Sequence, residues 1–481
     1  NPTAGTRGAG TAAPAAPAGR AAPADDTTGI ARAARAATAA GGARWPLLAA
    51  LAAVGLGAMS TALYHGQTTR VGSAVDLFLP WWTLREALAG GHSPYDITLG
   101  MGARAARFDG LPPPWPAFPY RFAYPIYVAL FLAPVLPLPY PWAAAVWMSA
   151  LILITATFSA LVCHVLRWPA TPAGRLLATL GGTLSYPAAI SIILGQITAL
   201  ALLFLAGAVL LAGRRAPRPL PQPVSDPGPA APPISEAAAG KAATSPPWRE
   251  LLAGVMLACS TIKPQLMWLV LPLLLLDAIR RRRSALPLAT MTTLAGLCLV
   301  PLWWLPAWPI EFLHSLGGYA ADEPTPSTML LLAQALVQRS MDGHWTGPSA
   351  VIAVAGSVVL LVLTLIWWWR RRPDTPRLLA VALTVTLMVT PLRAQTAQLA
   401  LLMPCLWVMQ TLVRRHREAW GVAWGAVFIA GYWVLVVSRI DAPEHWLRQL
   451  VPPLVTLLAL AATLRATAPP GPAPAAARRD A

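Results

Sequence analysis

Residues 142–166, WAAAVWMSALILITATFSALVCHVL, decide the fold, because this stretch is long, apolar and free of Asp, Glu, Lys and Arg. Similar blocks of roughly 14–25 residues recur along the chain, and about 20 residues of helix cross the core of a bilayer. Only helices and closed barrels pair all their backbone groups within lipid, and long Leu, Ala and Val runs favour helices. With 56% hydrophobic residues, the chain is therefore expected to be an all-α polytopic membrane protein.

We expect about twelve transmembrane helices, of which the pair flanking Lys263 is short for full spans. The predicted ranges are 45–64, 142–166, 176–193, 196–213, 250–262, 264–279, 284–304, 350–369, 378–392, 397–413, 418–437 and 450–464.

Three segments rich in Ala, Gly and Pro lack apolar periodicity and are expected to be disordered. They are a cytoplasmic tail at 1–44, a Pro-rich cytoplasmic linker at 214–248 and a second tail at 466–481. The predicted N-terminal membrane module covers 45–213, with a first outer loop at 65–141 that carries interfacial helices. The remaining predicted helices cover 249–465, with an outer loop at 305–349.

The net charge of +17 comes from arginines in the short loops between apolar blocks. They form no stripe, so we expect no nucleic-acid partner and interpret them as topology signals. Placing both termini in the cytoplasm of a plasma-membrane protein puts every basic cluster inside, as the positive-inside rule requires. This topology holds only if residues 121–139 form a proline-bounded helix at, or dipping into, the outer leaflet. The alternative is that they make a plain span.

In this topology, unusual polar residues gather at the outer face. Asp76 lies in the first outer loop, Gln196 and Lys263 lie in outer turns, and Lys263 is one of only two lysines. An ionisable group between apolar helices is a functional candidate, although snorkelling to the headgroups also explains a lysine at a turn. For Asp76 the alternative is a solvated loop acid, and for Gln196 an interhelical hydrogen bond.

Four segments, in order, resemble glycosyltransferase family 87, a family of GT-C membrane glycosyltransferases. They are VDLFLPWWTLREALAGGHSPYD at 75–96, FAYPIYVALFLAPVLPLP at 122–139, LGQITALALLFLAGAVLLAGR at 194–214 and LAGVMLACSTIKPQLMWLVLPLLLL at 252–276. The resemblance covers roughly residues 45–300, and the chain diverges from the family in its C-terminal half. It implies a GT-C-like fold.

The resemblance implies inverting transfer of a hexose, by the family's example mannose, from a polyprenyl-phosphate sugar to a lipid or glycan acceptor at the extracytoplasmic face. It assigns the general base to Asp76. Lys263 and Arg393 are the cations expected to bind the donor phosphate. The further candidates for substrate binding are Tyr95, Gln196, His314 and Gln395.

No cofactor and no metal are expected, although Asp322, Glu323 and Asp342 leave a metal site open as an alternative. Residues 390–398, TPLRAQTAQ, depart from the family, whose mannosyltransferases have a His-His turn there. Two other functions therefore remain open, a transporter or flippase for a lipid-linked substrate and a catalytically degenerate scaffold. Membrane lipids are expected partners in every case.

Overall fold

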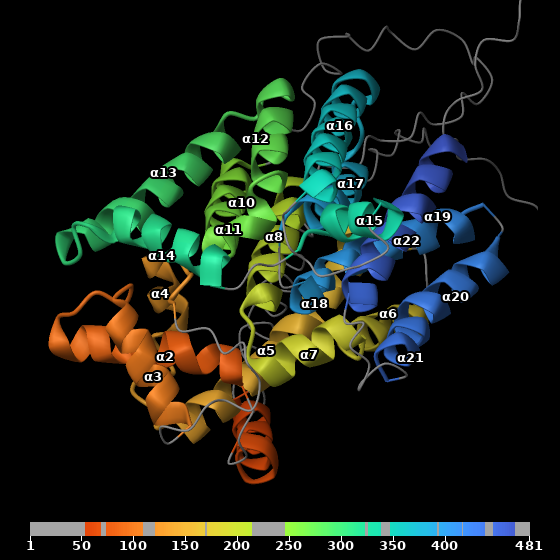
Figure 1. The fold of residues 1–481 in the computed structure, drawn as a ribbon. Coiled ribbons are helices and arrows are strands. Elements are labelled where there is room, and N and C mark those ends of the chain that lie inside the picture. Colours follow the sequence, from red (N-terminus) through yellow and green to blue (C-terminus); the bar gives the residue numbers. More distant parts are fainter. Residues whose placement is uncertain are drawn as a thin grey trace, which may run out of the picture. The chain divides into compact units, whose positions relative to one another are not determined.

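A computed structural model describes residues 53–68, 74–108, 121–168, 171–213, 246–322, 326–337, 347–391, 394–415, 417–437 and 446–466. The chain divides into two units, residues 1–57 and 58–481. Residues 53–57, the described part of the first unit, are helical. The described part of the second unit is also helical and contains no strand (Figure 1). The predicted tails and most of the predicted linker lie outside the described residues.

The described helices vary widely in length, from four residues to 26. The first group is α2 (Val75–Gly90), α3 (Ile97–Arg107), α4 (Ala129–Leu132), α5 (Tyr140–Val165), α6 (Pro172–Thr183), α7 (Tyr186–Leu194) and α8 (Thr198–Gly213). The second group is α10 (Pro247–Cys259), α11 (Pro264–Met267), α12 (Val270–Arg280), α13 (Ala285–Leu299) and α14 (Trp308–Asp322). The third group is α15 (Thr328–Val337), α16 (Gly347–Arg371), α17 (Thr375–Val389), α18 (Ala394–Ala397), α19 (Leu402–Val413), α20 (Glu418–Ala426), α21 (Tyr432–Val437) and α22 (Trp446–Ala466).

Several helices are long and apolar enough to cross a membrane, which supports the prediction of a helical membrane protein. Among the described residues there are five: Tyr140–Val165, Ala285–Trp303, Gly347–Arg371, Glu418–Val437 and Leu447–Arg465. The pair α6 and α7 makes a sixth if it counts as one span bent by 52°.

The predicted count of about twelve spans is not confirmed. Four apolar blocks form shorter helices, Thr198–Gly213, Thr328–Val337, Thr375–Val389 and Gln398–Val413. The predicted block at 45–64 lies partly outside the described residues. A bend such as the one before Pro187 divides an apolar block without lowering its hydropathy, because proline cannot continue the preceding helix.

Residues 121–139 do not form the single helix expected from the sequence. They contain one 3₁₀ turn, Ile126–Val128, followed by the four-residue helix α4. Prolines at 125, 134, 137 and 139 prevent a longer helix, because each lacks the backbone N–H that a helix needs. The indole N–H of Trp81 donates to the carbonyl of Val135 at 3.2 Å, so this segment is attached to α2.

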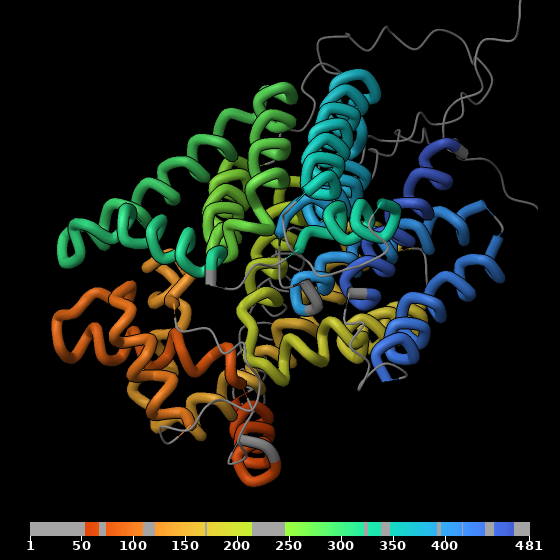
Figure 2. The backbone as a smooth tube through the Cα atoms, viewed as in Figure 1, coloured from red at the N-terminus to blue at the C-terminus, as the bar shows by residue number. Residues whose placement is uncertain are grey.

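The helices that support the candidate site form one packed series, in which α5 packs on α8, α8 on α10, and α10 on α13. The helices α10, α12 and α13 gather together in green in Figure 2. Gly254 of α10 allows the close approach of α13. A Cβ atom at this position would lie 2.6 Å from the Cβ of Ala289 and 2.7 Å from the carbonyl oxygen of Leu286. Small residues at such contacts let two helix backbones come close.

Gly254→Ala is expected to lower the stability of the protein by about 1–3 kcal/mol, because backbone atoms of α13 must move to admit the methyl group. The measurement is the thermal unfolding midpoint in detergent. Gly296→Ala on α13 is the matched control, since nothing lies within 4 Å of its Cβ position. Equal midpoints for the two variants would contradict the close approach of α10 and α13.

Candidate functional site

The residue before α2 is attached to the end of α7 by a backbone hydrogen bond and to α5 by a side-chain hydrogen bond. The N–H of Ala74 donates to the carbonyl of Ile193 at 2.8 Å. The hydroxyl of Tyr140 donates to the carbonyl of Ala74 at 2.7 Å. Ala74 adopts a left-handed conformation with φ +49°, from which α2 begins. The direction of α2 is therefore fixed at the residue that precedes it.

Gly195 forms the other half of this contact. Its φ is +74°, a conformation that glycine adopts without steric cost. A Cβ atom here would lie 3.0 Å from the Cβ of Leu77 and 3.1 Å from that of Ala74, so α2 rests directly on the glycine. The indole N–H of Trp147 donates to the Gly195 carbonyl at 2.9 Å and holds the turn from the side of α5.

This contact brings together three residues that the sequence singled out. The amide Nε2 of Gln196 donates to Oδ2 of Asp76 at 2.5 Å. The ammonium Nζ of Lys263 donates to Oε1 of Gln196 at 3.0 Å and also to the hydroxyl of Thr198. We call Asp76, Gln196, Thr198 and Lys263 the Asp76–Lys263 network. The network joins a carboxylate to an ammonium through one amide, and these three groups come from segments that are far apart in the sequence.

Lys263 reaches the network because the chain breaks beside it. The helix α10 ends at Cys259, a 3₁₀ turn covers Ser260–Ile262, and Pro264 begins α11. A residue that precedes proline is pushed out of the helical region, and Lys263 has φ −123° and ψ 77°. Only 6% of the residue is exposed. Burial lowers the pKa of the Lys263 ammonium to about 8, and the Asp76 carboxylate acts in the opposite direction.

Asp76 is half-buried and lies in the first turn of α2. The N-terminal end of a helix carries a partial positive charge, which favours the ionised carboxylate. The guanidinium of Arg107, from α3, lies 5.3 Å from the ring of Phe78 and 4.8 Å from the ring of Tyr140. A second cation is thus held beside the helix that carries Asp76.

Tyr124 lies near Asp76, and its only signal in the sequence is the Tyr-Pro pair. Burial raises the pKa of its phenol, and the nearby Asp76 and Tyr319 raise that pKa further. The phenol of Tyr95 donates to the backbone carbonyl of Tyr124 at 2.9 Å. Burial also raises the pKa of Tyr95, and Tyr127 and Glu311 add to the rise. Both phenols therefore remain neutral hydrogen-bonding groups at physiological pH.

The helix α14 packs against the same region from the predicted 305–349 loop, which contains α14 and α15. The hydroxyl of Ser93 donates to Oε2 of Glu311 at 2.5 Å, and the hydroxyl of Ser315 donates to the carbonyl of Phe122 at 2.9 Å. The guanidinium of Arg121 lies against Gly318, where a Cβ atom would be 2.5 Å from the Arg121 Cζ.

The other predicted site residues are not joined to the network. His314 is exposed on α14, and within the described residues it has no hydrogen bond to the network. Arg393 lies outside the described residues. Gln395 belongs to α18, but its side chain is outside the described part of the structure. Thr198, Arg107 and Tyr124 are the residues that sequence reasoning missed.

No group of three or more His, Cys, Asp and Glu side chains suited to a metal occurs in the described part of the chain. Of the residues considered for such a site, Glu323 and Asp342 lie outside the described residues, as does the side chain of Asp322.

The sequence model of glycosyltransferase family 87 matches residues 122–391, more than half of the chain. The chain belongs to glycosyltransferase family 87. Comparison with curated proteins and with solved structures found no match. The family match supports a membrane glycosyltransferase.

The family match differs in extent from the resemblance seen in the sequence. It continues to residue 391, beyond the point near 300 where the resemblance was expected to fade. It includes Gln196 and Lys263 but begins after Asp76. The candidate site of this family 87 protein therefore includes a segment that lies outside the family match.

The two lysines of the chain allow a direct test of the environment of Lys263. After reductive methylation with ¹³C-formaldehyde, each dimethyl-lysine gives an NMR signal that shifts as the amine loses its proton. We expect the Lys263 signal to titrate near pH 8, because burial disfavours the charged form. Lys263→Arg and Lys241→Arg assign the two signals. A Lys263 midpoint near the ordinary lysine pKa of about 10.4 would contradict the buried position.

Proposed function

We propose that this protein transfers a hexose, mannose by family resemblance, from a polyprenyl-phosphate sugar to a hydroxyl of a lipid or glycan acceptor. The transfer takes place at the extracytoplasmic face of the plasma membrane and inverts the anomeric centre. The observation that carries the proposal is the Asp76–Lys263 network, in which a carboxylate and a buried ammonium share one amide. Membership of family 87 supports the reaction class.

In this proposal Asp76 is the general base. The acceptor hydroxyl attacks the anomeric carbon and its proton passes to the Asp76 carboxylate. The bond between the anomeric carbon and the phosphate oxygen breaks, and its electron pair leaves with the polyprenyl phosphate. One carboxylate is sufficient, because attack opposite the leaving group needs no covalent intermediate. The half-buried Asp76 stays accessible for this task.

Lys263 supplies positive charge for the departing phosphate. An ammonium has three N–H donors, and in the described residues two of them meet Gln196 and Thr198. The third is proposed to meet a phosphate oxygen, where it stabilises the charge that develops as the bond breaks. Arg393 is the second cation proposed for this phosphate.

Gln196 is a positioning residue in this mechanism. Its amide orients one Asp76 oxygen and separates the carboxylate from the ammonium, so the two charges do not form a direct ion pair. The ammonium therefore keeps its third donor for the phosphate. Tyr95, His314 and Gln395 remain proposed contacts for the sugar. The mechanism needs no cofactor.

A transporter would place unneutralised acids within its helices along a substrate path. The acid that the structure buries most clearly is Asp277, with 3% exposure. Its two oxygens accept from Arg280 at 2.7 Å and from Arg281 at 2.6 Å. Asp277 is therefore neutralised at the end of α12, and it gives no support to a transporter.

Asp76→Asn is expected to reduce transfer by about 10²–10⁴-fold, since it removes the base while keeping the side-chain shape. The assay follows radiolabelled polyprenyl-phosphate sugar into native lipid and glycan acceptors in membranes. Glu86→Gln is the matched control, because it removes one charge about 15 Å further along the same helix. Equal loss in both variants would remove Asp76 from the mechanism. No transfer by the wild type, with lipid-linked sugar still bound, would favour a transporter or a scaffold.

The pKa of Lys263 predicts an alkaline limit to the reaction. The useful form is the protonated ammonium, so kcat/KM for the donor is expected to fall as the pH rises through about 8. In Lys263→Arg the guanidinium keeps its proton at this pH, so any remaining activity should show no such fall. The same fall in both proteins would show that another group is responsible.

A further inference from the structure

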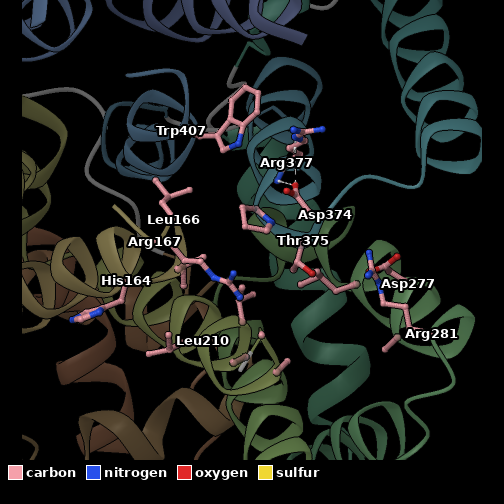
Figure 3. Close-up of a pocket in the computed structure, with 18 of the residues that line it drawn as sticks. His164, Leu166, Arg167, Leu210, Asp277, Arg281, Asp374, Thr375, Arg377 and Trp407 are labelled. Atoms are coloured by element: carbon pink, nitrogen blue, oxygen red, sulfur yellow. Dashed lines mark hydrogen bonds and ion pairs between the residues drawn. The ribbon is translucent and has the colours of Figure 1, made fainter. Parts of the chain in front are cut away.

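A second charged region lies at the opposite helix ends from the Asp76–Lys263 network. There the structure has a cavity of about 1110 Å³ (Figure 3). It is lined by residues of α5, α8, α10, α12, α13, α17 and α19 and of the turns beside them. The helix α8 connects the two regions, with Thr198 in the network and Gly213 at the cavity. Its 16 residues span about 24 Å.

Arginines dominate the charged lining of this cavity. Six of them line it, against two acids, Asp277 and Asp374. The arginines are Arg167, Arg249, Arg281, Arg283, Arg377 and Arg414. Asp277 is already neutralised by Arg280 and Arg281. Asp374 caps α17, where it accepts from the N–H of Arg377 at 3.1 Å. Arg283 lies 3.9 Å from Glu250 and Arg377 lies 3.7 Å from Asp374, so the excess positive charge of the described lining comes from Arg167, Arg249 and Arg414.

Arg167 is the cation placed best for a ligand. Its backbone is fixed, because the Arg167 carbonyl accepts from Gln410 and from Arg414, each at 3.2 Å. Its φ is +51°, which residues other than glycine seldom adopt. Figure 3 shows its side chain extending toward the middle of the cavity. Within the described residues, no hydrogen bond or ion pair engages its guanidinium. A second cation, Arg249, has its guanidinium over the ring of Trp248 at 5.3 Å.

Apolar side chains also line the cavity, together with the polar residues His164, Thr375, Gln410 and Thr411. The apolar side chains include Leu166, Leu210, Leu257, Leu274 and Trp407. A small soluble anion would leave these side chains against water. A lipid with a phosphate headgroup would match both the arginines and the apolar side chains. Its phosphate pairs with guanidinium groups and its chain covers apolar surface.

We propose that this cavity binds the phosphate headgroup of an anionic lipid, with Arg167 and Arg249 on the phosphate and the chain along the apolar wall. The ligand class is a phosphate ester carried by a lipid. Its source is either a membrane phospholipid or a polyprenyl phosphate. The site is separate from the Asp76–Lys263 network, and the inference does not depend on the proposed transfer. Arginines that the sequence indicated as topology signals thus acquire a second role.

The test measures binding to the purified full chain in detergent by native mass spectrometry. The probes are dioctanoyl-phosphatidylglycerol, farnesyl phosphate, inorganic phosphate and zwitterionic dioctanoyl-phosphatidylcholine. The variant Arg167→Gln/Arg249→Gln is compared with Arg465→Gln, which changes an exposed arginine in the last turn of α22 away from the cavity. We expect the double variant to bind the anionic lipids about tenfold more weakly or worse, since it loses charge-assisted hydrogen bonds. Arg465→Gln should bind them like the wild type.

The outcomes separate the two sources. Arginine-dependent binding of both lipids, or of either one alone, supports the site, and a single binder identifies the source. Inorganic phosphate that binds as tightly as the lipids would overturn the lipid assignment. Equal affinity of the double variant and Arg465→Gln would overturn the site.

A measurement on the wild-type chain covers the case in which the double variant fails to fold. Phosphatidylglycerol and farnesyl phosphate probes that carry a diazirine on the chain should crosslink to peptides containing residues 164–167, 208–213 or 249–257. Adducts confined to other peptides would overturn the proposal.

Discussion

The carboxamide of Gln196 is the interaction on which the candidate site depends. It donates to Asp76 and accepts from Lys263, so a single planar group fixes the positions of an acid and a cation from two distant segments. An amide is suited to this place because it offers a donor at one end and an acceptor at the other. A carboxylate there would repel Asp76, and an apolar side chain would remove one of the two acceptors that the buried ammonium has among the described residues.

The burial of Lys263 carries a free-energy cost that the surrounding helices must offset. Removing an ammonium from water is costly, and the protein offsets that cost with two hydrogen bonds and a nearby carboxylate. Surface lysines need no such support. The helices that enclose Lys263, α8 and α10, also lead to the arginine-lined cavity at their other ends. One pair of packed helices thus separates two cationic regions of different character.

The sequence predicted the helical membrane fold and three members of the network, because apolar blocks and the arginine pattern placed Asp76, Gln196 and Lys263 at the same helix ends. It missed Thr198, Arg107 and Tyr124, since nothing in a sequence shows which side chain turns toward which. The predicted number of spans is not confirmed, because several apolar blocks form helices too short, among the described residues, to count as candidate spans. The single helix expected at 121–139 does not form, because four prolines there lack the backbone N–H that a helix needs.

The attachment of α2 has a consequence for how this region tolerates change. Ala74 is held by its own N–H and carbonyl, and one of its partners is the backbone of Ile193. Backbone groups are present whatever the side chain, so replacements at position 193, and at position 74 those small enough for a fully buried site with φ +49°, would preserve this anchor. Sequence drift in the segment before residue 122 is therefore compatible with an unchanged location of the carboxylate. The residues that match the family's sequence pattern and the residues that hold the carboxylate in place can therefore differ.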